Sequence, residues 1–342
     1  VSYATDKRST EFFDPELRKL RVALGKALPG KPLVTFVDAT ADEKKLLLFA
    51  AGDTDPGTYY VYDKTSRQLA EIMPSRPELA KTGLSPMRAV NFPAADGTSI
   101  PGYLTLPPGS DGKNLPAIVM PHGGPGSRDE WGFDWLVQFY AARGFAVLQP
   151  NFRGSTGYGD SWFQKNGFQS WRTAIGDVND GGRWLVAQGI ATPDKLAVVG
   201  WSYGGYAASR AAQRDGDKYR CTVSGAGVHD LPAMVNYDKN YLGGYGAKVG
   251  LGAAGDLKPI SPAYHAEMFS TPILIVHGAK DQRVPVAQSR GLVSKLKAAG
   301  KKEGVDFRYV EQPLNTHNLL REEDRTQFLQ EVKKFLDKYN PA

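Results

Sequence analysis

Hydrophobic and polar positions follow two different patterns along the chain. Up to about residue 85, short apolar runs alternate with turn-forming residues, a pattern typical of antiparallel strands. It predicts strands at residues 32–37, 45–50, 58–62 and 68–73. Four short strands within about 40 residues match the size of one blade of a β-propeller. Residues 1–85 are therefore predicted to be the carboxyl-terminal portion of a propeller domain, which is incomplete.

A single blade cannot bury both faces of its sheet, so propellers need several blades around an axis. The predicted blade would expose apolar faces at Leu46, Leu48, Tyr60 and Tyr62. Residues before Gly30 are expected to supply at most the tail of another blade. We therefore expect this chain to be the carboxyl-terminal part of a longer enzyme, with the remaining blades coming from a missing segment or another chain.

From residue 86 onward, apolar strands alternate with helical stretches. A hairpin is expected first, with strands at 88–94 and 99–105. Further strands are predicted at 117–120, 146–150, 196–199, 222–226, 273–277 and 307–311, and most of them precede a helical stretch. Buried strands alternating with helices predict a doubly wound, mostly parallel α/β sheet over residues 86–342. In such sheets functional residues gather on loops that leave the carboxyl ends of the strands.

The pentapeptide Gly200-Trp201-Ser202-Tyr203-Gly204 lies between one of these strands and the helical stretch at 206–213. A serine in a G-x-S-x-G turn between strand and helix is typical of a nucleophile elbow. Alone the motif is weak, because a serine that only caps the following helix would look the same. A dinucleotide site fits less well, since the spacing is not G-x-G-x-x-G, and no Gly-Lys-Ser/Thr of a P-loop occurs.

A nucleophilic serine needs a base, and the base needs an acid that orients it. Asp281 follows the strand at 273–277, and His317 follows the strand at 307–311. The order Ser202, Asp281, His317 is the order found in α/β-hydrolases. Three groups on three loops at one sheet edge, in this order, predict an α/β-hydrolase fold with a catalytic triad.

The negative charge formed during acyl transfer also needs hydrogen-bond donors. The backbone N–H of Tyr203, directly after Ser202, is one predicted donor. The second is expected from the turn His122-Gly123-Gly124-Pro125, with Gly124 preferred over Gly123. This turn is also expected to be ordered by the His122 side chain.

The remaining histidines are weaker candidates for the catalytic base. His265 and His277 are expected to be structural, whereas His229 follows a strand and either touches substrate or packs inside. No cluster of histidines has the spacing of zinc ligands, so we expect no metal and no cofactor.

Composition narrows the classes of partner. The 342 residues carry a net charge of +6, but the basic residues are scattered, so no nucleic-acid partner is expected. No apolar stretch approaches the roughly 20 residues of a membrane helix, so no membrane partner is expected. The single cysteine, Cys221, excludes internal disulfides and a cysteine metal cluster. The compartment, cytoplasmic or exported, and the formation of a homo-oligomer stay open.

Several segments together carry a family resemblance. HGGPGSRDEWGF, GFAVLQPNFRGSTGYGDSW, GWSYGGYAASRAA and ILIVHGAKDQRVP, with the late His317, resemble the prolyl oligopeptidase family of serine peptidases, in particular its acylaminoacyl-peptidase and dipeptidyl-aminopeptidase-like branch. The resemblance covers about residues 87–339. It implies an α/β-hydrolase domain preceded by a β-propeller. It also supports the triad of Ser202, Asp281 and His317 and the oxyanion donors Tyr203 and Gly124.

Two positions depart from the family pattern. Thr316 precedes the predicted base, where glycine or aspartate is common. The HGGP segment differs from that of true prolyl oligopeptidases and dipeptidyl peptidases, where a tyrosine side chain serves the oxyanion. This second departure points away from strict cleavage after proline.

The resemblance also implies a substrate pocket. This pocket is expected to hold the side chain before the scissile bond. Its lining is expected to comprise Tyr203 and four residues of the loop after the strand ending near Gly227, namely Val228, Leu231, Met234 and Tyr237. An apolar lining of this kind predicts a preference for apolar or aromatic side chains. Asn151 and Arg153 either contact the substrate backbone or only brace their loop.

The sequence thus predicts a serine peptidase that hydrolyses short peptides through an acyl-enzyme. The alternatives are a carboxylesterase or lipase-like hydrolase with the same triad, and an inactive propeller–hydrolase that serves as a binding module. Activity on peptide p-nitroanilides against short acyl esters separates the first two readings, and labelling by a fluorophosphonate separates both from the third.

Overall fold

The computed structural model describes residues 2–164, 167–239 and 256–342. The chain divides into two compact units. The first comprises Val1–Ala89, Tyr103–Ser110 and Glu130–Gly144, and the second comprises Val90–Gly102, Asp111–Asp129 and Phe145–Ala342. Within the described residues, no helix combines the length and the apolar character needed to cross a membrane.

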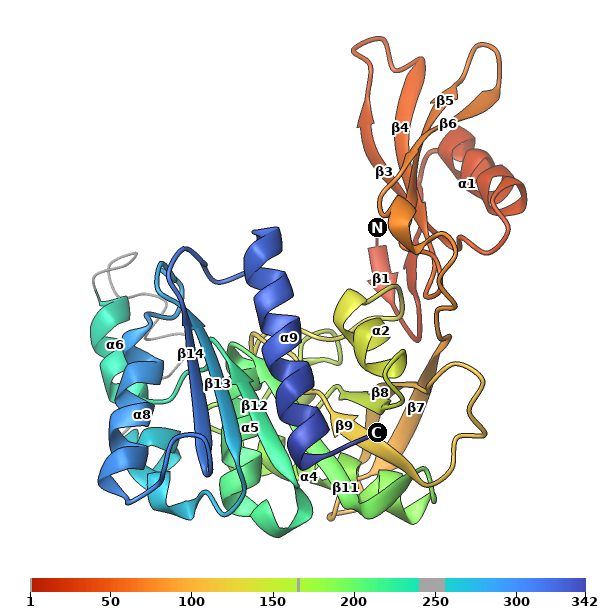
Figure 1. Cartoon of the computed structure of the whole chain (residues 1–342). Coiled ribbons are helices and arrows are strands. Elements are labelled where there is room, and N and C mark those ends of the chain that lie inside the picture. Colours follow the sequence, from red (N-terminus) through yellow and green to blue (C-terminus); the bar gives the residue numbers. More distant parts are fainter. Residues whose placement is uncertain (1, 165–166, 240–255) are drawn as a thin grey trace. The chain divides into compact units, whose positions relative to one another are not determined.

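The first unit contains two small antiparallel sheets, consistent with residual propeller blades (Figure 1). One is a hairpin of β1 (Ser2–Ala4) and β2 (Arg8–Thr10). The other has four strands in sequence order: β3 (Leu33–Ala39), β4 (Lys45–Ala51), β5 (Thr58–Asp63) and β6 (Gln68–Pro74). All four strands predicted for one blade are confirmed, each within two residues of its expected ends.

Between the two sheets lies a helix that the sequence analysis missed, α1 (Pro15–Ala27). Asp14 caps it, because its carboxylate accepts a hydrogen bond from the N–H of Leu17 at 2.9 Å, and Pro15 occupies the first turn, where its missing N–H costs nothing. The expectation that residues before Gly30 would only end another blade was therefore wrong. Aspartate followed by proline and glutamate was the signal that marks this helix start.

The helix covers one face of the blade. Leu24 of α1 and Leu28, directly after the helix, pack in one apolar cluster with Leu46, Leu48 and Tyr60 of the sheet. These three side chains are buried, so the expectation that they would stay exposed without further blades is corrected. Tyr62 is partly buried against the same cluster.

Further elements of the first unit are η1 (Pro77–Leu79) and α2 (Trp135–Ala141). Asp134 caps α2 through the N–H groups of Leu136 and Val137. The Gln138 amide of α2 exchanges two hydrogen bonds with the backbone of Ser85, at 2.9 and 2.8 Å.

The main sheet has eight strands in the order β14-β13-β12-β11-β9-β10-β8-β7. The pairs from β14 across to β10 are parallel, and β7 and β8 form the predicted hairpin at the other edge. The bounds are β7 (Met87–Pro93), β8 (Ser99–Thr105), β9 (Leu115–Val119), β10 (Ala146–Pro150), β11 (Ala191–Trp201), β12 (Cys221–Gly225), β13 (Ile273–Gly278) and β14 (Phe307–Gln312). The predicted mostly parallel α/β-hydrolase sheet is confirmed.

Helices flank this sheet. Helix α5 contacts β11 and β12, and helix α9 contacts β12 and β13. In Figure 1, α9 lies in front of these last two strands. Among the described residues of the second unit, the helices are α3 (Asp160–Phe163), α4 (Trp171–Ala187), α5 (Tyr203–Arg214), α6 (Leu231–Asp238), α8 (Ala287–Ala298) and α9 (Glu322–Tyr339), with the shorter η2 (Gly216–Lys218), η4 (Lys258–Ile260) and η5 (Pro262–Met268). One of them, α6, occupies the stretch after Gly227 that is expected from the sequence to be a loop.

Candidate active site

Ser202 stands at the turn from β11 to α5. Its backbone has φ 60° and ψ −122°, a left-handed conformation that is strained for a residue with a side chain. A Cβ at Gly200 would overlap the carbonyl oxygen of Gly204, and a Cβ at Gly204 would overlap that of Pro121. The two glycines of the motif therefore allow the strand and the helix to approach this closely, as a nucleophile elbow requires.

The alternative, that Ser202 only caps α5, does not match its contacts. Its backbone N–H donates to Gly225 and its carbonyl accepts from Tyr206, so the backbone is held at both ends. In the described first turn of α5, however, the Ser202 side chain makes no capping hydrogen bond. The hydroxyl is thus left for another use, and the side chain is only half-buried.

The carboxylate of Asp281 accepts a hydrogen bond from Nδ1 of His317 at 2.6 Å. Its other oxygen accepts the backbone N–H groups of Arg283 and Val284, both at 2.8 Å. Burial alone would raise the pKa of Asp281, but hydrogen bonds from His277, His317 and Val284 outweigh it and hold that pKa well below its usual range. Because Asp281 is ionised, the proton of the His317 ring stays on Nδ1, and Nε2 is left as an acceptor.

A second histidine supports the same carboxylate. His277, at the end of β13, is fully buried, and its Nε2 lies 2.8 Å from the carbonyl oxygen of Val284 and 3.4 Å from Asp281 Oδ2. Its Nδ1 lies 2.7 Å from the hydroxyl of Ser289. Since the Val284 carbonyl can only accept, Nε2 carries the proton. His277 is structural, as expected, but the sequence did not reveal its contact with Asp281, four residues later.

The loop after β14 is fastened to the neighbouring strands. The N–H of Lys280 donates to the carbonyl of Asn315 at 3.0 Å. A Cβ at Gly278 would overlap the carbonyl oxygens of Asn315 and Thr316, so only glycine permits this approach. The structure thus brings the loops of Asp281 and His317 together at the carboxyl edge of the sheet, beside the end of β11.

The predicted oxyanion turn lies against the elbow. A Cβ built on Gly123 would lie 3.6 Å from Cβ of Ser202, whereas Gly124 adopts φ +124° and faces the backbone of Ser127. His122 orders this turn, because its Nδ1 lies 2.7 Å from the Gly123 carbonyl and its Nε2 lies 2.7 Å from the Ser155 hydroxyl. Burial lowers the pKa of His122 to about 4, so the ring is neutral near pH 7 and orders the loop without a charge.

Tyr203, the other predicted donor, opens α5. Its backbone N–H belongs to the first turn of the helix, where N–H groups have no partner within the helix. Its ring is buried against Phe168 at 4.8 Å, and its hydroxyl donates to the carbonyl of Gly167 at 2.9 Å. The phenol is therefore used in packing, and the main chain is the group that remains for an oxyanion.

Asn151 and Arg153 hold their own loop. The Asn151 amide accepts the N–H of Asp129 at 2.8 Å and donates to the Asp129 carbonyl at 3.1 Å and to the Tyr158 hydroxyl at 2.9 Å. Arg153 donates to Asp177 and Asp96. Of the two roles left open by the sequence, these contacts match bracing of the loop.

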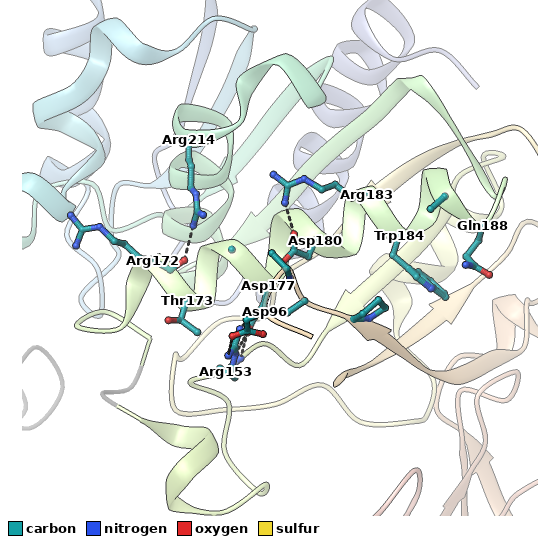
Figure 2. Close-up of a pocket in the computed structure, with 15 residues that line it drawn as sticks. Asp96, Arg153, Arg172, Thr173, Asp177, Asp180, Arg183, Trp184, Gln188 and Arg214 are labelled. Atoms are coloured by element: carbon teal, nitrogen blue, oxygen red, sulfur yellow. Dashed lines mark hydrogen bonds and ion pairs between the residues drawn. The ribbon is translucent and has the colours of Figure 1, made fainter. Parts of the chain in front are cut away.

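Arg153 also borders a cavity of about 710 Å³ (Figure 2). Its lining includes Asp96, Asp177, Arg183 and Trp184, from the turn after β7 and from α4. Ser202, Asp281 and His317 are not among the lining residues. This cavity is therefore separate from the predicted triad.

The residues expected to line the substrate pocket lie on and before α6. Val228, Leu231 and Met234 are buried, and Tyr237 is half-buried with its hydroxyl donating to the carbonyl of Gln282 at 2.8 Å. That contact ties α6 to the loop of Asp281. His229 is fully buried beside Ser224, so of its two open roles the structure gives it the packed one.

Among the described residues, no group of three or more His, Cys, Asp or Glu side chains is placed to hold a metal ion. The mostly parallel sheet with a strained serine between strand and helix defines an α/β-hydrolase. More narrowly, the chain belongs to the prolyl oligopeptidase family of serine peptidases, whose profile matches residues 131–341.

Similar proteins fall within one group of peptidases. Dipeptidyl aminopeptidase BIII of Pseudoxanthomonas mexicana is 31% identical over 98% of this chain and 50% of its own length. The acylamino-acid-releasing enzyme of Arabidopsis thaliana is 28% identical over 67% of this chain and 31% of its own length. This chain therefore spans half or less of the curated relatives it matches.

Solved structures share the fold. A Mycobacterium tuberculosis puromycin-hydrolyzing peptidase superposes with a TM-score of 0.76 at 23% identity, covering 87% of this chain and 46% of that one. A Pyrococcus horikoshii acylaminoacyl peptidase superposes with a TM-score of 0.77 at 21% identity, covering 92% and 51%.

Proposed function

We propose that this chain carries the catalytic domain of a serine peptidase that hydrolyses short peptides through an acyl-enzyme on Ser202. The observation that carries the proposal is the strained serine at the elbow, whose side chain makes no capping hydrogen bond in the described first turn of α5. The residue before it, Trp201, is hydrogen-bonded to the backbone of a histidine whose ring is fixed to a buried carboxylate. We assign the catalytic domain to residues 86–342 and the carboxyl-terminal portion of a propeller to residues 1–85.

In the proposed reaction, Ser202 Oγ attacks the scissile carbonyl carbon while Nε2 of His317 accepts the hydroxyl proton. The Asp281 carboxylate stabilises the imidazolium that forms, through the hydrogen bond to Nδ1. The backbone N–H groups of Tyr203 and Gly124 donate to the oxyanion. His317 then protonates the leaving amine, and water, deprotonated by the same ring, releases the acyl group. No cofactor takes part in these steps.

The substrate is proposed to be a short peptide, either with a free amino terminus or with a blocked one. The names of the relatives, a dipeptidyl aminopeptidase and an acylamino-acid-releasing enzyme, support this class. The proposed preference for apolar or aromatic residues before the scissile bond rests on the family resemblance. Of the expected lining residues, Tyr237 has a half-buried side chain, and Tyr203, Val228, Leu231 and Met234 are buried. That preference is expected to be roughly 10–200-fold in kcat/KM over charged residues. A substrate series in which lysine or glutamate is cut best would refute it.

The triad is tested by comparing Ser202→Ala and His317→Ala with Ser209→Ala on peptide p-nitroanilides. Loss of one triad member is expected to lower kcat by about 10⁴–10⁶. Ser209 is a matched control, because it is a buried serine of α5 whose hydroxyl has no hydrogen-bond partner within the described chain. His317→Ala retaining more than about a tenth of the activity would assign the base to another residue.

A fluorophosphonate probe gives an independent reading. The unaltered chain and Ser209→Ala are expected to be labelled, and Ser202→Ala is not. An unlabelled wild-type protein would favour an inactive binding module. Hydrolysis of short acyl esters without any cleavage of peptide p-nitroanilides would favour an esterase.

A further inference from the structure

The ring of Phe152 packs against the side chains of His122 and Tyr203. It stacks on the His122 imidazole, with centroids 4.4 Å apart and planes 15° apart. The centroid of the Phe152 ring lies 5.7 Å from that of the Tyr203 ring, and the planes of the two rings are 30° apart. His122 orders the Gly123-Gly124 turn, and Tyr203 supplies the other N–H. One fully buried ring therefore contacts the residues that set both donor positions.

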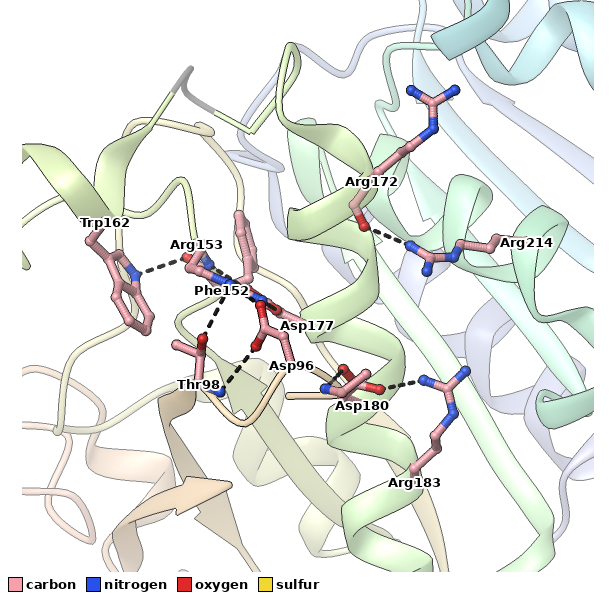
Figure 3. Close-up of polar contacts among 11 residues, drawn as sticks. Asp96, Thr98, Phe152, Arg153, Trp162, Arg172, Asp177, Asp180, Arg183 and Arg214 are labelled. Atoms are coloured by element: carbon pink, nitrogen blue, oxygen red, sulfur yellow. Dashed lines mark hydrogen bonds and ion pairs between the residues drawn. The ribbon is translucent and has the colours of Figure 1, made fainter. Parts of the chain in front are cut away.

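The backbone of Phe152 is fixed by hydrogen bonds to its carbonyl oxygen. The backbone N–H of Ser155 donates to it at 3.0 Å, and the Ser155 hydroxyl oxygen lies 2.7 Å from it. The Trp162 indole donates to it at 3.2 Å (Figure 3). Ser155 also lies 2.7 Å from His122. The loop from Phe152 to Ser155 is thus joined to the oxyanion turn by a polar contact as well as by the stacked rings.

The next residue, Arg153, anchors this loop to α4. Its backbone N–H donates to Asp177 Oδ2 at 2.9 Å, its Nε donates to the same oxygen at 3.0 Å, and its Nη2 donates to Oδ1 at 2.7 Å. Nη1 reaches Asp96 at 2.6 Å, as Figure 3 shows. A planar guanidinium matched to a carboxylate in this way fixes orientation as well as distance.

Both side chains of this ion pair are largely buried. The side chain of Asp177 is 1% exposed and that of Arg153 is 14% exposed. Burial raises the pKa of Asp177, and the three hydrogen bonds from Arg153 oppose that rise. Neither partner can be lost without leaving buried polar groups unpaired. The pair therefore constrains the positions of its two side chains far more than an ion pair on the surface does.

We propose that the Arg153–Asp177 pair is a positioning device for the oxyanion donors, which acts through the Phe152 ring. Oxyanion stabilisation depends on placing donors to within a fraction of an ångström, and packed supporting residues provide that accuracy. Arg153 and Phe152 touch no reacting atom in this scheme. The inference rests on the proposed function, because it assumes that Tyr203 and Gly124 bind the oxyanion.

The cavity beside the pair makes a direct test feasible. Arg153, Asp177 and Asp96 all line the opening of about 710 Å³, so a small cation can replace a deleted guanidinium (Figure 2). Arg183 provides the matched control. It lines the same cavity and pairs with Asp180 and Asp215, and its ion pairs do not involve the loop of Phe152.

The experiment compares Arg153→Ala with Arg183→Ala on a peptide p-nitroanilide. Removing one oxyanion donor costs about 10²–10³ in kcat, so displacing the donors is expected to cost about 10–100-fold, with KM changed by less than about threefold. Added methylguanidinium chloride should restore part of the kcat of Arg153→Ala and leave that of Arg183→Ala unchanged. Equal kcat values for the two variants would overturn the proposal.

A double variant covers the case in which Arg153→Ala does not fold. Arg153→Met/Asp177→Asn removes both charges, and the Asn amide oxygen keeps an acceptor for the backbone N–H of residue 153. It should fold and still show the loss of kcat. Full activity of this double variant would overturn the proposal.

A double-mutant cycle tests the route through the ring. Phe152→Leu alone should lower kcat, and adding it to Arg153→Ala should lower kcat less than the product of the two single effects, because both act on one element. Independent, multiplicative effects would refute the route. The outcomes are distinct from failure of the proposed function, in which the unaltered protein itself would be neither active nor labelled by a fluorophosphonate.

Discussion

The indole N–H of Trp201 donates a hydrogen bond to the carbonyl oxygen of His317, at 2.7 Å. This joins the residue directly before the proposed nucleophile to the backbone of the proposed base, 116 positions later. The Trp201 ring is itself held edge-on by Phe328 of α9 at 5.3 Å, and only a glycine at position 225 leaves it room. A single side chain thus sets the distance between the elbow and the loop of His317.

Trp201→Phe should therefore lower kcat. The variant keeps an aromatic ring against Phe328 but loses the N–H, so the His317 loop gains freedom. We expect a decrease of about tenfold in kcat with little change in KM, since misplacement of reacting groups acts on the chemical step. Steady-state kinetics on a peptide p-nitroanilide measure it. Trp131→Phe is the control, because it loses an indole hydrogen bond to the carbonyl of Met87 within the first unit. An equal decrease in this variant would mean that the contact with His317 is not what matters.

The buried His277 predicts a second effect on the triad. His277→Leu removes one of the groups that hold the Asp281 carboxylate in place and leaves the Val284 carbonyl without its partner. We expect kcat to fall by about tenfold or more, as second-layer changes commonly do around functional groups. Ser289→Ala removes only the outer contact of His277 and should cost less. Equal losses in both variants would show that fold stability, rather than the carboxylate, is affected.

How much the sequence revealed depends on the range of each interaction. The strands of the blade and of the main sheet were predictable because alternation and apolar runs are local signals. Ser202 was predictable because its flanking glycines are required where the strand and the helix approach each other closely. The contact of His277 with Asp281 was not, since it depends on a loop that turns back on its own strand. Arg153 illustrates the same limit: its motif was noticeable, but Asp177, its partner, lies 24 residues later on a helix.

The missed helix α1 has a different explanation. Its first-turn signals, Asp14 and Pro15, were present in the sequence, but a helix in front of a propeller blade conflicts with the expected architecture. Leu20 and Leu24 lie four residues apart on one face of α1, which is the spacing that packs both against the sheet.

This packing predicts that Leu24→Ala destabilises the first unit. Removing a buried leucine side chain costs about 2–5 kcal/mol. Val22→Ala on the same helix is the control, because Val22 is 58% exposed and its loss should cost less than about 0.5 kcal/mol. Urea unfolding, followed by a probe in the blade, measures both. Equal effects would mean that α1 does not cover the blade in solution.

Acid stability follows from the buried histidines. Burial lowers the pKa of His229 to about 3 and that of His122 to about 4, whereas both titrate near 6.5 in an unfolded chain. Between these values the unfolded state binds more protons than the folded state, so the free energy of unfolding falls as the pH falls. The loss begins near pH 6.5 and is complete only below the folded pKa of each group.

For His229 alone, the loss between pH 7 and pH 5 amounts to about 2 kcal/mol. His229→Leu removes this titration, and its Nδ1 has no hydrogen-bond partner within the described chain, so the substitution costs few contacts. We therefore expect the variant to lose about 2 kcal/mol less than the unaltered protein over this pH range, whatever its stability at pH 7. Denaturant unfolding at pH 7, 6 and 5 measures the slope. Thr222→Val, a buried substitution that removes no titratable group, is the control and should leave the slope unchanged. Parallel curves for His229→Leu and the unaltered protein would mean that His229 is not held neutral inside the fold, and would reopen its role as a group that meets substrate.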